Sequence, residues 1–169
     1  FRTSSVLFFL TFIYGGIITF IVLFAQSLGI GNYSLFFTVY AAVLFIARPI
    51  AGRLSDQRGA DVVVIPGLIL ATVGIIMLGL AQGLAYFLIS AVFIGLGFGS
   101  AQPSLQALTI KLAPPERRGA ANATFFSSFD LGIGFGAITL GAVSTLVGYA
   151  GMYLFSSLAG IIGLVLYWQ

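Results

Sequence analysis

The chain has 169 residues, of which 60% are hydrophobic and 7% are charged, with a formal net charge of +3. This composition excludes an ordinary water-soluble domain, and so small a positive charge in an apolar chain does not indicate a nucleic-acid partner. The absence of cysteine excludes a disulfide framework.

Apolar stretches of membrane-spanning length follow one another along the whole chain, separated by short connectors. A helix needs about 20 residues to cross a bilayer core, and only closed backbone structures survive in hydrocarbon. The second stretch reaches this length only with its half-polar continuation, residues 48–54. We therefore predict six transmembrane helices, at residues 3–25, 34–47, 62–81, 86–110, 119–146 and 152–168.

Charge is distributed unevenly between the connectors. If the helices alternate in direction, all 7 lysine and arginine residues fall on one side of the membrane. The opposite connectors, at residues 26–33, 82–85 and 147–151, carry no charge. Because basic residues stay on the cytoplasmic side, we predict an integral multi-pass protein with both termini in the cytoplasm. The chain opens without methionine and ends at the edge of a membrane helix, which favours a fragment of a longer protein.

The six helices divide into two units of opposite orientation within one bundle, residues 1–84 and 85–169. Secondary transporters contain such inverted three-helix repeats. The corresponding first and fourth helices carry glycine runs, at residues 14–16 and 95–99, and Pro103 follows the second run. We expect these runs to interrupt both helices and to mark a binding site near the membrane midplane.

Polar residues are concentrated on some helices. The third and sixth stretches are almost wholly apolar, so we expect them to face lipid while the other four surround a cavity. Five residues of the fourth helix share one face at the helical period. This face is either a substrate-contacting groove or an interhelical contact, in which glutamine bonds a neighbour. Its members are Gly95, Gly99, Gln102, Gln106 and Thr109. Candidate aromatic contacts, or else packing residues, are Tyr14, Phe20 and Tyr40.

Asp130 is the one acid that we place inside the membrane. It lies about 16 Å into the fifth helix at 1.5 Å per residue, close to the bilayer centre. A bare carboxylate there is costly, so Asp130 is protonated, paired or hydrated. An acid that takes up and releases a proton as access alternates would couple transport to protons. Otherwise Asp130, protonated or bonded to Ser127, locks helices together, or it pairs with a part of the protein outside this chain.

The connector at residues 48–59 reads Arg-Pro-Ile-Ala-Gly-Arg-Leu-Ser-Asp-Gln-Arg-Gly. It resembles the Gly-x-Leu-x-Asp-Arg-x-Gly-Arg-Lys/Arg loop of the major facilitator superfamily. It departs from that motif at Gln57, Ala60 and Asp61, where the full motif is basic, and a degraded copy joins helices 8 and 9 in that family. The motif positions that match are Gly52, Leu54, Asp56 and Gly59.

The connector at residues 112–119 is similar to the family's link between helices 10 and 11. It holds Glu116, Arg117 and Arg118, and an acid and a proline suit the first turn of the fifth helix. The fourth helix lacks an arginine often found in the family's helix 4, and the fifth lacks the Gly-Pro element of helix 5. The resemblance thus covers the whole chain as helices 7–12, with the N-terminal half absent.

This resemblance implies alternating access, in which two six-helix halves rock about a central site. The connector residues Gly52, Arg53, Asp56, Arg58 and Gly59 would form a conformational latch. In such a latch, Asp56 accepts hydrogen bonds from a helix N-terminus and pairs with an arginine in one state only. The alternative is that these charges are solvated and serve only topology.

The residue content does not favour an enzyme. The chain has no histidine and no cysteine, P-loop signatures are absent, and we expect no metal site or cofactor. We also expect no lysine or arginine near mid-depth in the cavity helices, which argues against a strongly anionic substrate.

The sequence therefore predicts an all-α membrane protein that is half of a twelve-helix major facilitator fold, in a bacterial inner membrane. The expected partners are the lipid bilayer, a small-molecule substrate, protons and the missing N-terminal half. Proton-coupled efflux of a drug or metabolite is the favoured function. The alternatives are an uptake permease and a non-transporting receptor or scaffold on the same fold.

Overall fold

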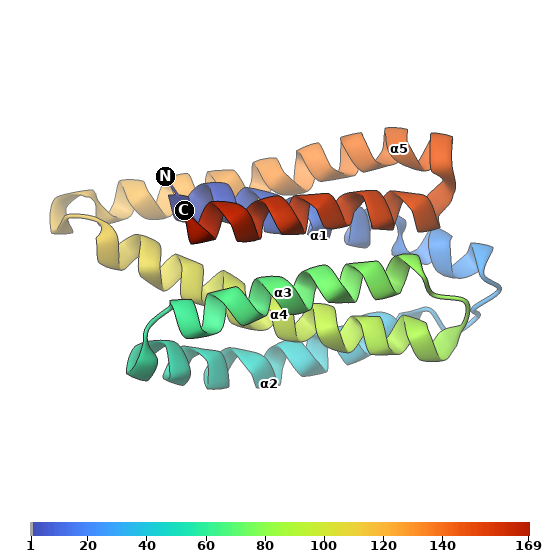
Figure 1. Ribbon diagram of the computed structural model, residues 1–169, viewed down its shortest axis with the longest axis horizontal. Helices are drawn as coiled ribbons and strands as arrows, with labels where there is room; N and C mark the ends of the chain where they lie inside the picture. Colours follow the sequence, from blue (N-terminus) through green and yellow to red (C-terminus); the bar gives the residue numbers. More distant parts are fainter. Residues whose placement is uncertain (1) are drawn as a thin grey trace.

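The computed structural model describes residues 2–169, and its apolar stretches are helical (Figure 1). Within these residues, 5 helices are long and apolar enough to cross a membrane. The all-helical membrane class that we predicted is therefore confirmed. The elements are α1 (Arg2–Ser27), α2 (Ser34–Arg58), α3 (Asp61–Gly79), α4 (Leu84–Leu112), a short 3-10 turn η1 (Pro115–Arg117) and α5 (Arg118–Trp168).

The longest element, α5, reverses direction within its 51 residues. A straight helix of that length would extend about 75 Å, far more than the roughly 30 Å of a bilayer core. Gly148 breaks the helix with φ 73° and ψ 176°, a conformation that side chains other than glycine rarely adopt. Figure 1 shows the C-terminal arm running back alongside the first arm. The reversal falls within the predicted connector 147–151.

The second helix continues beyond the end that we expected. α2 runs through Arg48 and Pro49 and ends at Arg58, so most of the predicted connector 48–59 is helical. The helix stops at Gly59, whose positive φ of 93° turns the chain while its N–H donates to the Ser55 carbonyl at 2.9 Å. Arg48 therefore belongs to the helix and not to a non-helical connector, whereas its cytoplasmic side stays a prediction.

The packing joins the helices in two groups. α1 packs most extensively on α5, and α4 packs most extensively on α3 and α2. The C-terminal arm of α5 also contacts α3, as the approach of Leu154 to Gly79 and of Thr72 to Gly160 shows. The buried core is therefore shared by helices far apart in sequence. Among its largest fully buried side chains are Phe24, Phe36, Phe87, Phe125 and Tyr153.

The glycine runs do not interrupt α1 or α4. Both helices continue through them, and Pro103 lies inside α4, so the expected interruptions are wrong. Instead these glycines let backbones approach. A Cβ at Gly15 would clash with the Ile133 carbonyl of α5, and one at Gly97 would lie 2.5 Å from the Ala71 nitrogen of α3. The glycines therefore serve packing, as small residues do in membrane bundles.

The charged connectors gather at one end of the bundle. Figure 1 shows the α2–α3 and α4–α5 connectors at the same end, toward which both chain termini also lie. The α1–α2 and α3–α4 connectors and the reversal in α5 lie at the other end. The basic residues at the helix ends therefore share one end of the molecule.

The contact between α1 and α5 can be tested with one methyl group. A Cβ at Gly136 would clash with the Phe12 carbonyl, so Gly136→Ala forces the two backbones apart. Overpacking of this kind costs about 1–3 kcal/mol. We expect the melting temperature of the detergent-solubilised protein to fall by several degrees.

Gly134 of the same helix is the matched control, because a Cβ added there meets nothing within 4 Å. Gly134→Ala should leave the melting temperature unchanged or raise it slightly, since alanine favours helix. Equal effects of the two substitutions would contradict the packing described for α1 and α5.

Candidate functional site

Arg48 of α2 is the polar residue that our reading of the sequence misplaced. Its Nη2 donates a hydrogen bond to Oε1 of Gln102 on α4 at 3.2 Å. Gln102 is one of the predicted cavity residues, and Arg48 lies about ten residues, or 15 Å, before the end of α2. The signal was present in the sequence, because the second stretch needs residues 48–54 to reach spanning length.

Aromatic rings lie next to this pair. Tyr14 of α1 stacks on Tyr40 of α2, with ring centroids 6.2 Å apart. Tyr14 also contacts Phe98 of α4, with centroids 4.9 Å apart. Tyr40 lies about two turns before Arg48 on α2, and Phe98 lies about one turn before Gln102 on α4. Three helices therefore bring the predicted contacts Tyr14 and Tyr40 close to an arginine.

The remaining polar residues of α4 bond to neighbouring helices. Gln106 Nε2 donates to Oδ1 of Asn122 on α5 at 3.1 Å. Thr109 donates to the Thr3 hydroxyl of α1 at 2.7 Å, in a buried position. Both contacts are of the interhelical kind that was one of our two interpretations of this face.

Gly95 and Gly99 are covered by α2 and do not form an open groove. A Cβ at Gly95 would lie 3.1 Å from the Tyr40 carbonyl oxygen, and one at Gly99 would lie 2.9 Å from the Ala47 Cβ. Both glycines are buried. The predicted face of α4 therefore has two roles. Gly95 and Gly99 pack against α2, whereas Gln102 bonds Arg48.

Asp130 is exposed on the first arm of α5. It is about 20° around the helix from Ala137, which lies beside Gly15 of α1, and about 80° from Asn122, which bonds α4. Both lie in the same direction around the helix from Asp130, and Gly134 on its other flank has nothing within 4 Å of an added Cβ, so the carboxylate lies outside the contacts that α5 makes with α1 and α4. Among residues 2–169 it makes no ion pair or hydrogen bond, so the predicted bond to Ser127 is not formed.

The predicted latch lies at the charged end. Arg53, Asp56 and Arg58 are exposed in the last turns of α2, and Asp56 makes no ion pair within the part of the chain that the structure describes. Gly52 and Gly59 have nothing within 4 Å of an added Cβ. The latch function stays a prediction.

The second charged connector begins with a short turn rather than with α5 itself. Glu116 and Arg117 lie in η1, α5 begins at Arg118, and all three are exposed. We had expected Glu116 in the first turn of the long helix. Pro114 has φ −54° and ψ 147°, an extended conformation that ends the turn after α4.

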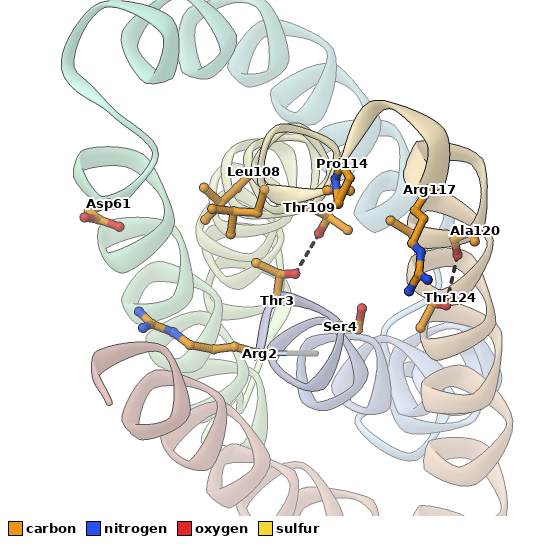
Figure 2. Close-up of a pocket in the computed structure, with 13 residues that line it drawn as sticks. Arg2, Thr3, Ser4, Asp61, Leu108, Thr109, Pro114, Arg117, Ala120 and Thr124 are labelled. Carbon is orange, nitrogen blue, oxygen red and sulfur yellow. Dashed lines mark hydrogen bonds between the residues drawn. The ribbon is translucent and has the colours of Figure 1, made fainter.

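A cavity of about 620 Å³ opens at the same end, between the ends of α1, α4 and α5 (Figure 2). Arg2, Thr3, Thr109 and Arg117 are among its lining residues. Beside it, Arg2 donates to the Tyr167 carbonyl, and the Tyr167 hydroxyl donates to Asp61 Oδ1 at 2.6 Å. This contact joins the ends of α1, α3 and α5.

Comparison with known sequences decides the family. The Major Facilitator Superfamily sequence profile matches residues 3–169. The chain belongs to this superfamily. An uncharacterized MFS-type transporter of Pseudomonas aeruginosa is 30% identical over 153 residues, covering 90% of this chain and 38% of that protein. The Staphylopine export protein of Staphylococcus aureus is 27% identical over 158 residues, covering 91% and 40%.

A shorter match is Multidrug resistance protein 3 of Bacillus subtilis, 32% identical over 106 residues, covering 63% of this chain and 20% of that protein. Among solved structures, a POT family transporter in complex with a thioalcohol conjugated peptide has a TM-score of 0.88 at 24% identity. The match covers 99% of this chain and 37% of the POT family transporter, and it shows that the two share a fold. The chain thus spans well under half the length of these superfamily members.

The exposure of Asp130 can be tested with cysteine chemistry, because this chain has no native cysteine. In a full-length transporter without other cysteines, we expect Asp130→Cys to react with a water-soluble methanethiosulfonate reagent. Phe125→Cys of the same helix, whose parent side chain is 0% exposed, is the control and should stay unmodified. Labelling of position 125 alone would contradict the orientation of α5.

Proposed function

We propose that this chain is the C-terminal half of a superfamily carrier that moves a small organic molecule across the membrane by alternating access. Membership of the superfamily supports transport. A further observation supports the proposal. Polar side chains of α2, α4 and α5 meet in a mostly apolar bundle, where Arg48 bonds Gln102 and Gln106 bonds Asn122, and we call these residues the polar face. Polar side chains at such depth are costly unless they face protein or water. The substrate path would run along this face, past Arg48, Gln102 and Asp130.

The proposal includes six crossings, with the two arms of α5 as the fifth and sixth. The length of α5 and the break at Gly148 support this count. The gathering of charged connectors at one end supports a cytoplasmic position for that end, by the positive-inside rule. Both termini would then lie in the cytoplasm, and a bacterial inner membrane suits the bacterial relatives.

The packing pattern supports inverted repeats. If residues 1–84 and 85–169 are repeats, then α1 corresponds to α4, and α2 and α3 correspond to the two arms of α5. In the structure α1 packs mainly on α5, and α4 packs mainly on α2 and α3. Exchanging the two repeats thus reproduces the same contacts, as a pseudo-two-fold axis requires.

We propose export as the direction and protons as the coupling ion. The Staphylopine export protein and Multidrug resistance protein 3 are similar to this chain, which favours efflux. Asp130 supplies the titratable group, because it is exposed and has no partner within residues 2–169. A carboxyl in that position can exchange a proton with whichever side the cavity opens to.

Single cysteines test the six crossings. With a membrane-impermeant maleimide on intact cells, we expect Asn32→Cys, Gln82→Cys and Ala150→Cys to be labelled. Arg58→Cys and Arg118→Cys should be labelled only after lysis, because their connectors lie at the opposite end. Protection of position 150 in intact cells, with labelling at 32 and 82, would contradict two crossings in α5.

Proton coupling is tested with Asp130→Asn in the full-length transporter. In inside-out vesicles, an imposed pH gradient should drive accumulation of ethidium by the parent protein. We expect the amide, which cannot titrate, to abolish this accumulation at equal expression. Ser127→Ala, on the same face of α5, is the matched control and should retain most of it. Undiminished transport by Asp130→Asn would refute coupling through this residue and favour a proton-independent carrier.

A further inference from the structure

Arg48 points away from the lipid-facing side of α2. On that side, Ile46 and Ile50 line an apolar groove of about 230 Å³ with α3, and they are 60% and 61% exposed. Residues two apart lie about 200° apart around a helix, so Arg48 is opposite both isoleucines. Its bond to Gln102 of α4 agrees with this direction. The guanidinium therefore lies on the face that we assign to the substrate path.

The charge of Arg48 is not compensated within the described chain. No carboxylate of residues 2–169 forms an ion pair with it, and it donates a hydrogen bond to the neutral Gln102 amide. A guanidinium has five N–H donors in a planar fork, so most of its donors remain available. An arginine at this depth in a membrane helix needs an anionic or hydrogen-bonding partner, which makes it a functional candidate.

The surroundings define the shape of that partner. The Arg48 fork offers parallel N–H donors that match a planar carboxylate. The Gln102 side chain accepts from Arg48 through Oε1, which leaves its amide nitrogen as a further donor beside the guanidinium. The half-buried rings of Tyr14 on α1 and Tyr40 on α2 offer apolar faces, and the buried ring of Phe98 packs against Tyr14. A ligand with a carboxylate on an aromatic or apolar body would match both the N–H donors of Arg48 and Gln102 and the apolar rings beside them.

We propose that Arg48 and Gln102 form an anion subsite for a carboxylate of the transported molecule, whose apolar body packs on Tyr14 and Tyr40. This inference rests on the proposed transport function and names its substrate class. It replaces our expectation of a substrate without strong negative charge. That expectation assumed that no arginine lay inside the cavity helices, and Arg48 does.

The test compares a carboxylate with its uncharged amide. Indole-3-acetate and indole-3-acetamide have similar shape and differ in charge. We expect indole-3-acetate to raise the melting temperature of the purified full-length transporter, and the amide to have little effect. Charge-assisted hydrogen bonds contribute about 1.5–3 kcal/mol, so Arg48→Gln should weaken carboxylate binding by about tenfold or more. Arg48→Lys, which keeps the charge but not the fork, should bind with intermediate strength.

Lys111→Gln is the control, because it removes one positive charge from the exposed end of α4, outside the predicted latch, and should leave carboxylate binding unchanged. Gln102→Leu should weaken binding less than Arg48→Gln, since it removes only the orienting partner. The subsite is refuted if the parent protein does not prefer the carboxylate, or if Arg48→Gln retains the preference.

The melting temperature without ligand shows whether the carboxylate that pairs with Arg48 belongs to a ligand or to the transporter itself. If a fixed carboxylate elsewhere in the transporter pairs with Arg48, then Arg48→Gln lowers the melting temperature without ligand, and the parent shows no carboxylate preference. That result also refutes the subsite. Gradient-driven ethidium accumulation that survives Arg48→Gln leaves the transport function standing, whereas a parent protein that accumulates neither ethidium nor indole-3-acetate in a pH gradient would refute that function itself.

Discussion

Close contact between helix backbones, at positions where nothing larger than hydrogen fits, is the constraint on which this bundle depends. In hydrocarbon the burial of apolar side chains gives little preference for helix against lipid, so tight packing has to hold the helices together. α1 lies against α5 with Gly15 beside the Ile133 carbonyl, and α4 lies against α3 with Gly97 beside Ala71. These contacts fix the relative positions of helices that are distant in sequence.

The same contacts bring a few polar groups together. Gly95 and Gly99 hold α4 against α2, and one turn further along Gln102 meets Arg48. The small residues that first suggested a substrate groove instead position Gln102 and Arg48, for which we propose substrate binding. Along α2 and α4, one turn therefore packs the two helices together, and the next turn carries the residues of the proposed substrate site.

The polar residues between helices differ in whether they have a partner that satisfies them within the described chain. Thr109 with Thr3, and Gln106 with Asn122, pair neutral groups that satisfy one another and connect the ends of α1, α4 and α5. Arg48 and Asp130 are ionisable side chains that have no oppositely charged partner within residues 2–169. In a carrier, groups of the first kind maintain the bundle, whereas groups of the second kind are free to bind ligand or exchange protons.

Much of the fold followed from the sequence, since hydrocarbon permits few backbone structures. The length of the apolar stretches located α1, α3 and α4 closely, and the polar break at 147–151 located the reversal in α5. The motif around Gly52 and Asp56 led to the superfamily that the sequence profile supports. Periodicity also placed Gln102 and Gln106 together on one face of α4.

The tertiary structure decided which side of each helix meets which neighbour. Hydropathy reports depth in the membrane but not direction around the helix axis, so the partners of Gly95, Gln102 and Asp130 were not determined by it. Arg48 was misplaced for a related reason, because a charged residue beside a proline is typical of a connector. Only the structure shows that the helix continues and that its exposed arginine reaches Gln102 of α4.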